Sequence, residues 1–217
     1  MATPVKIDFV SDIACPWCAI GLASLQQALA RSADAVQATL QFQPFELNPD
    51  MPPGGEDVGE HLRKKYGSTP EQQAQIRETI RQRGADVGFV FKPEGRGRIV
   101  NTFDAHRLLH WAGLQGETAQ LALKRALLEA YHGRGEPVER ADVLLAAVGA
   151  AGLDVARAQD ILASDDHAAE VRAAERYYQQ AGIHSVPAII INDRHLISGG
   201  QPPEVFEQAL RQIAAAA

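Results

Sequence analysis

Apolar and polar residues alternate in two segments near the start of the chain. Residues 5–10 and residues 37–45 both follow this pattern, and alternation with a period of two predicts a β-strand in each. Between them, apolar residues recur at mostly helical spacing from residue 16 to about residue 30, which predicts a helix. Pro16 suits the first turn of that helix, because the first helical N–H groups have no partner inside the helix.

A run of chain-breaking residues at 48–55 marks a domain boundary. The sequence beyond it is predicted to be mainly helical, and Thr69-Pro70-Glu71-Gln72 has the pattern of a helix start with a capping box. Strand patterns return only near the end of the chain, at residues 187–192 and 195–198, after a helix placed at about 166–181. A final helix is predicted over residues 203–214.

This order of elements predicts an α/β protein with a thioredoxin-like fold interrupted by an all-helical insertion. A chain of 217 residues is long for one ordinary domain and short for two, which suits one domain carrying an insertion. We expect residues 1–55 and 166–217 to form the thioredoxin-like domain, and residues 56–165 to form the helical insertion domain.

Composition and charge narrow the class of partner. The formal net charge is −6, and because binding to phosphates needs a basic face, we expect no nucleic-acid partner. No apolar run approaches the ~18 residues of a membrane span, so we expect no membrane partner. The N-terminal residues lack the pattern of a secretion leader. We therefore expect a cytoplasmic protein.

The chain contains only two cysteines, Cys15 and Cys18, in the motif Cys-Pro-Trp-Cys. A disulfide across so short a loop would stabilise a fold by roughly 2 kcal/mol or less, so the pair suits reversible redox chemistry better than cross-linking. At the predicted helix start, free backbone amides and the helix dipole would stabilise a Cys15 thiolate. Cys18 lies one turn further on, on the same face. This arrangement assigns Cys15 as the nucleophile and Cys18 as the resolving cysteine.

The alternative for these cysteines is half of a zinc site. Zinc needs four ligands, and the seven histidines show no pair with finger-like spacing from the cysteines. His106 and His110 have helical i, i+4 spacing, but a core or surface role suits them better. We therefore expect no metal, and a zinc site shared between two copies of the chain remains the minor alternative.

Val186-Pro187 immediately precedes a predicted strand, where a trans proline would be awkward. A cis bond there would turn the Val186 amide and carbonyl toward the sulfurs. The alternative is an ordinary proline at the first residue of a strand. We expect these two residues, with Pro16 and Trp17, to support the active site.

Several short segments carry a resemblance to a known family, and they span nearly the whole chain: residues 11–18, 45–49, 101–102, 105–108, 186–187 and 197–202. On these segments the sequence resembles the DsbA family of thiol–disulfide oxidoreductases, and within it the cytoplasmic FrnE-like branch. It is similar, more distantly, to 2-hydroxychromene-2-carboxylate isomerase and kappa-class glutathione transferase.

The resemblance implies oxidation, reduction or isomerisation of protein or small-molecule disulfides through Cys15 and Cys18, with Pro187 in cis and no cofactor beyond the redox-active disulfide. It also implies that the helical insertion caps the active site, with Asn101 and His106 near the cleft. A helix cap and a packing role, respectively, are the alternatives for these two residues. The same relatives suggest a homodimer.

Two departures from the relatives' patterns bear on function. Periplasmic DsbA has His where this chain has Trp17, so Cys15 should be less acidic here. The isomerases and kappa enzymes have Ser in place of Cys15, and kappa enzymes bind glutathione through a Ser-Asp pair where this chain has Gly199-Gly200-Gln201. A glutathione-dependent isomerase or transferase, with glutathione as co-substrate, is therefore the second hypothesis. A chaperone-like binding module is the third, and two methionines with 6% aromatic residues disfavour it.

Overall fold

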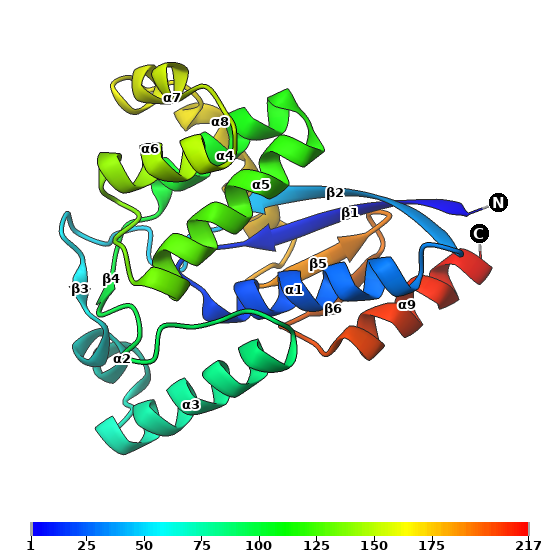
Figure 1. The fold of residues 1–217 in the computed structure, drawn as a ribbon, viewed down its shortest axis with the longest axis horizontal. Helices are drawn as coiled ribbons and strands as arrows, with labels where there is room; N and C mark the ends of the chain where they lie inside the picture. Colours follow the sequence, from blue (N-terminus) through cyan, green and yellow to red (C-terminus); the bar gives the residue numbers. More distant parts are fainter. Residues whose placement is uncertain (1, 217) are drawn as a thin grey trace.

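A mixed four-stranded sheet lies at the centre of the molecule, in a computed structural model that describes residues 2–216 (Figure 1). β1 is parallel to β2 and antiparallel to β5, which in turn is antiparallel to β6. Everything between β2 and β5 is therefore an insertion into one sheet. The strands run in the order β2 (Val36–Pro44), β1 (Thr3–Ser11), β5 (Ala188–Ile191) and β6 (His195–Ser198).

Two helices from the two ends of the chain cover one face of this sheet. Helix α1 (Pro16–Arg31) follows β1, helix α9 (Pro203–Ala215) follows β6, and the two pack side by side. Because β1 and β2 are parallel, α1 is the crossover between them and begins at the edge of the sheet where β1 ends. The short connection at residues 12–15 places the cysteine motif at that edge.

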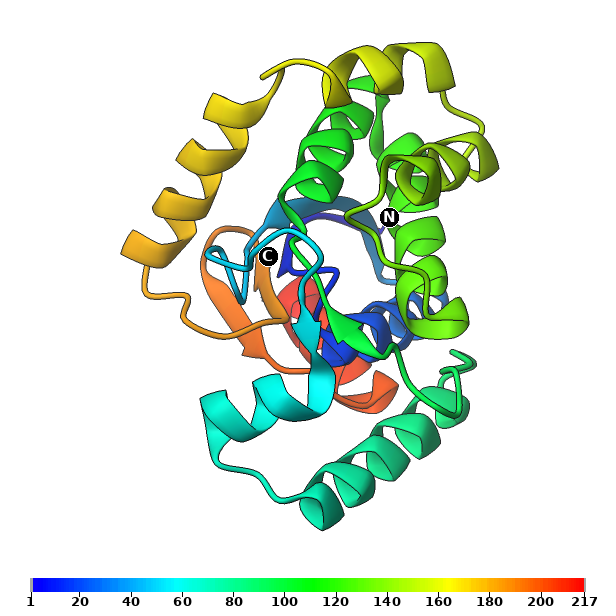
Figure 2. The ribbon, with the colours of Figure 1, turned by 90° about the vertical axis from the view of Figure 1, so that its left-hand side faces the viewer.

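The insertion is helical, and its helices form two groups on opposite sides of the sheet (Figure 2). A π-helical segment, η1 (Glu129–Arg134), continues α5. The first group is α2 (Val58–Tyr66) and α3 (Pro70–Asp86); the second is α4 (Phe103–Gln115), α5 (Glu117–Leu128), α6 (Ala141–Ala150), α7 (Val155–Leu162) and α8 (Ala168–Gln180).

Local sequence explains where several of these helices begin. The capping box predicted at the start of α3 is confirmed, since Thr69 accepts from the Gln72 N–H and Gln72 accepts from the Thr69 N–H. The structure also adds a small antiparallel ladder, β3 (Glu56–Asp57) with β4 (Arg98–Ile99), to a segment expected to be entirely helical. Two residues are too few to show an alternating pattern, so the sequence carries no signal for this ladder.

The apolar core runs without a break from the sheet into the insertion. Phe9 of β1, Leu25 of α1, Leu108 of α4 and Leu127 of α5 are all fully buried members of one cluster. The core does not divide at residues 55 and 165, so the two domain boundaries placed there stay a prediction. No helix in the described part of the chain is long and apolar enough to cross a membrane.

Candidate active site

Cys15 and Cys18 lie at the N-terminus of α1, where the chain leaves β1. Cys15 is the residue before the helix, with extended backbone angles (φ −90°, ψ 114°), and Pro16 occupies the first helical position. The Cys18 N–H donates to the Cys15 carbonyl at 3.1 Å. Both side chains are free thiols; Cys15 keeps 4% of its surface exposed and Cys18 none. Of the two cysteines, Cys15 is therefore the less completely buried.

The segment before β5 lies against the Cys15 sulfur. The Val186–Pro187 peptide bond is cis, and the Cys15 sulfur lies 3.5 Å from the Val186 carbonyl oxygen, within hydrogen-bonding range of a thiol. Gly21 of α1 makes this close approach feasible, because a Cβ at that position would lie only 3.1 Å from Pro187 Cγ. The C-terminal part of the chain thus packs against the first turns of α1, beside the Cys15 sulfur.

The two thiols differ in acidity. The pKa of Cys15 is lowered, chiefly by the hydrogen bond from the Cys18 thiol and also by backbone N–H groups, although burial and the negative Asp12 carboxylate raise it. Burial raises the pKa of Cys18 well above its usual value, and the hydrogen bond to Cys15 raises it further. Since the thiolate is the nucleophile, the environment favours Cys15 as the attacking sulfur and keeps the proton on Cys18.

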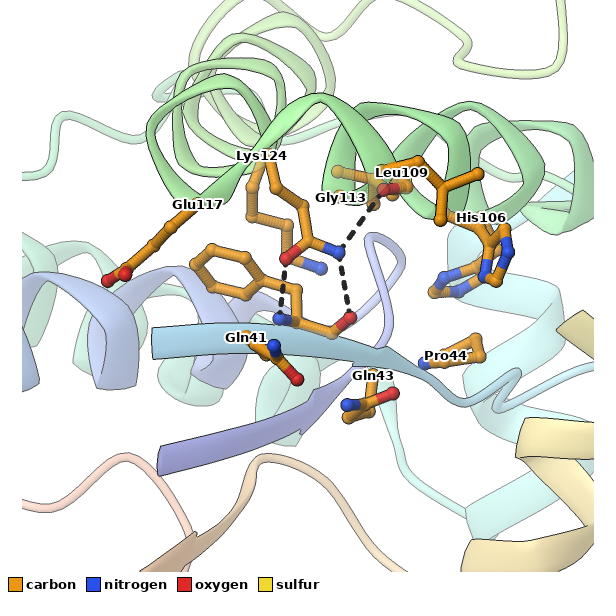
Figure 3. Close-up of a pocket in the computed structure, with 12 residues that line it drawn as sticks. Gln41, Gln43, Pro44, His106, Leu109, Gly113, Glu117 and Lys124 are labelled. Atoms are coloured by element: carbon orange, nitrogen blue, oxygen red, sulfur yellow. Dashed lines mark hydrogen bonds between the residues drawn. The ribbon is translucent and has the colours of Figure 1, made fainter. Parts of the chain in front are cut away.

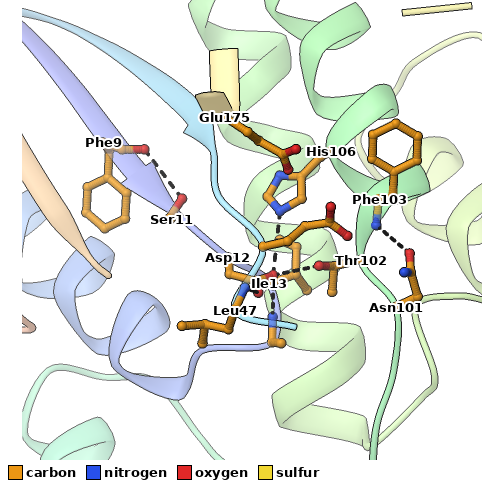
Figure 4. A network of polar contacts seen from close by, with 12 residues as sticks. Phe9, Ser11, Asp12, Ile13, Leu47, Asn101, Thr102, Phe103, His106 and Glu175 are labelled. Carbon is orange, nitrogen blue, oxygen red and sulfur yellow. Dashed lines mark hydrogen bonds and ion pairs between the residues drawn. The ribbon is translucent and has the colours of Figure 1, made fainter. Parts of the chain in front are cut away.

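The buried carboxylate of Asp12, three residues before Cys15, holds three segments of the chain together (Figure 4). Its oxygens accept hydrogen bonds from the N–H groups of Ala14 (3.0 Å) and Leu47 (2.7 Å) and from the Thr102 hydroxyl (2.8 Å). His106 Nε2 lies 3.5 Å from the same carboxylate. Burial opposes ionisation of Asp12, but His106 and the backbone donors outweigh it and hold the pKa of Asp12 below its usual value. The carboxylate therefore stays charged beside the redox pair.

Three further residues that were expected at the site, His106, Asn101 and Trp17, lie in three different environments. His106 projects from α4 and lies buried against the Asp12 carboxylate (Figure 4). The Asn101 side chain accepts from the Phe103 N–H at 2.9 Å, at the start of α4, so its role in a cleft stays a prediction. Trp17 is half-buried in the first turn of α1, and its carbonyl oxygen lies so close to Gly200 that a Cβ there would be 2.9 Å away.

Two buried side chains of the insertion also act on this site, and the sequence patterns did not single them out. His132 of η1 donates its Nε2–H to the Ile13 carbonyl at 2.8 Å, an acceptor that fixes the imidazole tautomer. Lys124 of α5 is fully buried, and the charges of Cys18 and Asp12 act on it. The one signal available for Lys124 is its place on the buried stripe of a helix, where an apolar residue is expected.

Comparison with known proteins identifies the family. Residues 6–211 match the family described as DSBA-like thioredoxin domain. The crystal structure of a probable DsbA oxidoreductase from Streptomyces coelicolor superposes with a TM-score of 0.89 at 33% identity, covering 98% of this chain and 90% of that one. The uncharacterized protein YwbO of Bacillus subtilis is 24% identical over 207 residues, 95% of this chain and 96% of that protein.

A more distant structure shares the fold. The cytosolic disulfide reductase DsbM from Pseudomonas aeruginosa, in its structure with GSH, superposes with a TM-score of 0.67 at 16% identity, covering 97% of this chain and 99% of that one. The family match spans nearly the whole chain and includes the paired cysteines at the start of α1. The chain therefore belongs to the DSBA-like thioredoxin domain family and is a thiol–disulfide oxidoreductase.

Proposed function

We propose that this protein exchanges disulfides with protein or small-molecule substrates through its Cys-Pro-Trp-Cys centre, with Cys15 as the nucleophile. The observation that carries the proposal is the contrast between the two thiols: the pKa of Cys15 is lowered, while that of the fully buried Cys18 is raised. Only the thiolate attacks a disulfide, so the more acidic and less buried sulfur reacts first.

The reducing direction proceeds in two exchanges. The Cys15 thiolate attacks a substrate disulfide, forms a mixed disulfide and releases one substrate sulfur as a thiolate. Cys18 then loses its proton, attacks the Cys15 sulfur and expels the second substrate sulfur. The oxidising direction is the reverse of both exchanges. The Val186 carbonyl beside Cys15 supplies a backbone acceptor for the substrate chain.

Serine substitutions test the two roles. Cys15→Ser should reduce turnover in an insulin-reduction assay to background, because the attacking sulfur is gone. Cys18→Ser should also stop turnover but accumulate a mixed disulfide between Cys15 and the substrate, which mass spectrometry detects. Alkylation of the reduced wild type at mildly acidic pH should label Cys15 first, and labelling of Cys18 first would contradict the assignment. A chaperone-like module would instead bind unfolded insulin without turnover in the wild type.

Glutathione as a thiol co-substrate is the second candidate. The observation in its favour is the similarity in fold to a disulfide reductase whose structure contains GSH. The Gly199–Gln201 segment, which lacks the Ser-Asp pair of the kappa enzymes, weighs against the isomerase and transferase versions of this role. Calorimetric titration of the Cys15→Ser variant with glutathione measures binding without the exchange reaction, and no heat of binding would exclude this candidate.

We also assign the chain to the FrnE-like branch and to the cytoplasm. In support, both of its cysteines belong to the redox pair, so the fold needs no structural disulfide and is compatible with a reducing compartment. A homodimer belongs to the same proposal, and sedimentation analysis of the purified protein measures it directly.

A further inference from the structure

Lys124 is a buried lysine in the apolar interior of the molecule. It is fully buried, and within the described residues its Nζ has no hydrogen-bond partner. The Phe42 ring centroid lies 5.7 Å from Nζ, near the outer limit of a cation–π contact. Taking an ammonium group out of water without a partner is costly. A polar group that lowers stability in this way needs an explanation other than packing.

The charges that act on Lys124 belong to the redox centre. Burial lowers the pKa of Lys124 to about 8, while Cys18, Asp12 and Cys15, in that order, raise it. The same coupling acts in the other direction, because the Lys124 charge lowers the pKa of Cys18 against the effect of burial. His132 also faces this region but stays neutral, since burial lowers its pKa to about 3. Helix α5 lies along α1 here, since Leu128, one turn after Lys124, and Ala19, next to Cys18, line one pocket, and Arg125 Nε donates to Gln26 Oε1 at 3.2 Å. The insertion thus brings a buried cation to the start of α1, where a Cys18 thiolate would form.

Lys124 contributes to the wall of a pocket that opens at the surface. The pocket has a volume of about 220 Å³ and lies between β2 and helices α4 and α5, with Lys124 and His106 both in its lining (Figure 3). Leu114 and Glu117, which also line it, are exposed residues, so the pocket opens at the surface. Lys124 therefore forms part of the wall of a pocket whose lining includes neither cysteine.

We propose that Lys124 is a positioning residue of the redox reaction: its buried ammonium stabilises the Cys18 thiolate as that thiolate forms. It thereby speeds the attack of Cys18 on the mixed disulfide. The inference rests on the roles proposed above for Cys15 and Cys18.

The step concerned is resolution of the mixed disulfide. The Cys18 thiol releases its proton to water, and its sulfur attacks the Cys15 sulfur. A bond forms between the two cysteine sulfurs, the bond from Cys15 to the substrate sulfur breaks, and the substrate sulfur leaves with the electron pair as a thiolate. Because Cys18 is fully buried, its negative charge is disfavoured unless an opposite charge lies nearby. Lys124 supplies that charge from the helical insertion.

Lys124→Met tests the inference, because methionine keeps the length of the side chain and removes its charge. When the reduced variant reacts with oxidised glutathione, the second glutathione should leave Cys15 roughly three- to tenfold more slowly, since Cys18 loses the charge that favours its thiolate. The pH at which this step accelerates should rise by about half a unit to one unit. Arg125→Met is the matched control: it removes the same charge from the adjacent exposed position and should change neither measurement, because solvent screens that charge.

Denaturant unfolding of the same variants separates this role from packing. Lys124→Met removes an unpaired buried charge and should unfold at an equal or higher denaturant concentration than the wild type. A lower stability together with an unchanged resolution rate would overturn the inference and leave dithiol exchange by Cys15 and Cys18 intact. If Lys124→Met fails to fold, Lys124→Gln must show the same slowing of the resolution step, and an unchanged rate overturns the inference. Absence of any exchange in the wild type would overturn both proposals.

Discussion

The acidity of Cys15 arises within the cysteine pair. From the sequence, backbone amides and the helix dipole were the expected sources. In the structure, the hydrogen bond from the Cys18 thiol has the largest effect on the pKa of Cys15, and the backbone N–H groups of Cys18 and Trp17 add to it. The Asp12 carboxylate acts against them. The residues between the cysteines, Pro16 and Trp17, contribute no charge.

Trp17→His should therefore make Cys15 more acidic. An imidazolium in the first turn of α1 adds a positive charge near the thiolate, and a charge at such range lowers a pKa by about one unit or more. The dithiol state gains stability, so the couple becomes more oxidising. Ultraviolet thiolate titration measures the shift, with Trp17→Phe as the control for loss of the indole ring. An unchanged titration in Trp17→His would show that this position does not influence the pKa of Cys15.

Short-range features of the site could be predicted from sequence, whereas long-range ones could not. Cys15 and Cys18 belong to one helical turn, so their spacing alone brings the sulfurs together. By contrast, Thr102 bonds Asp12 across 90 positions of the chain. The charges of the cysteines act on Lys124 because α5 packs against β2 and the start of the chain. A single sequence contains no signal for such pairs beyond a polar residue on an otherwise apolar helix face.

At the scale of elements, long segments were predictable and very short ones were not. The helix predicted from residue 16 to about residue 30 is α1 (Pro16–Arg31), and the strand predicted at residues 195–198 is β6. Helix α1 has enough residues to show its period, whereas β6 was predicted from the turn at Asn192-Asp193-Arg194 that precedes it. The two-residue strands β3 and β4 have no period to detect, and the π-helical turn η1 differs too little from an α-helix to be distinguished by spacing.

The Gln120 side chain takes the place of a neighbouring strand at the edge of β2. Its Oε1 accepts from the Phe42 N–H at 2.9 Å, and its Nε2 donates to the Phe42 carbonyl at 3.0 Å and to the Leu109 carbonyl at 3.2 Å. Two residues further back along β2, the Leu40 N–H donates to Glu117 Oε1 at 2.7 Å. These contacts fasten α4 and α5 to the sheet.

Gln120→Ala should lower the free energy of unfolding by about 2–3 kcal/mol, because it leaves the buried N–H and carbonyl of Phe42 without partners. Urea unfolding at neutral pH measures the change. Gln115→Ala, at an exposed position on the preceding helix, is the matched control and should stay within about 0.5 kcal/mol of the wild type. A Gln120→Ala variant as stable as that control would show that solvent satisfies the Phe42 groups.

At the scale of the whole molecule, buried polar contacts join the insertion to the redox centre. His132 of the insertion donates to the Ile13 carbonyl, and Thr102 donates to Asp12, so both contacts reach the connection between β1 and α1. That connection ends in Cys15. The insertion therefore holds the backbone that leads into Cys15.

His132 should make the stability of the molecule depend on pH below neutrality. Burial, aided by the charge of Arg96, lowers the pKa of His132 to about 3, whereas an unfolded chain titrates its histidines near ~6.5. Between these values the unfolded state binds one more proton than the folded state, so stability falls as the pH falls. The loss due to His132 between pH 7 and pH 5 is about 2 kcal/mol.

The His132→Phe variant tests this pH dependence, because it removes the titrating group. The variant should be less stable at pH 7, because the Ile13 carbonyl loses its donor, but it should lose about 2 kcal/mol less than the wild type on acidification to pH 5. Urea unfolding at the two pH values measures both effects. An NMR titration in which the His132 imidazole of the folded wild type protonates above pH 5 would contradict this interpretation.

The covered edge of β2 also bears on aggregation. A strand of nine residues at the edge of a sheet is a template for pairing with another chain. Here the side chains of Gln120 and Glu117 occupy that template, while β6 at the opposite edge is only four residues long. The insertion therefore protects the edge of β2 from pairing with another chain. In a partly folded chain in which α5 is detached from the sheet, the unpaired N–H and carbonyl groups of β2 would be exposed. Such a chain should aggregate through this edge even if all four strands of the sheet are formed.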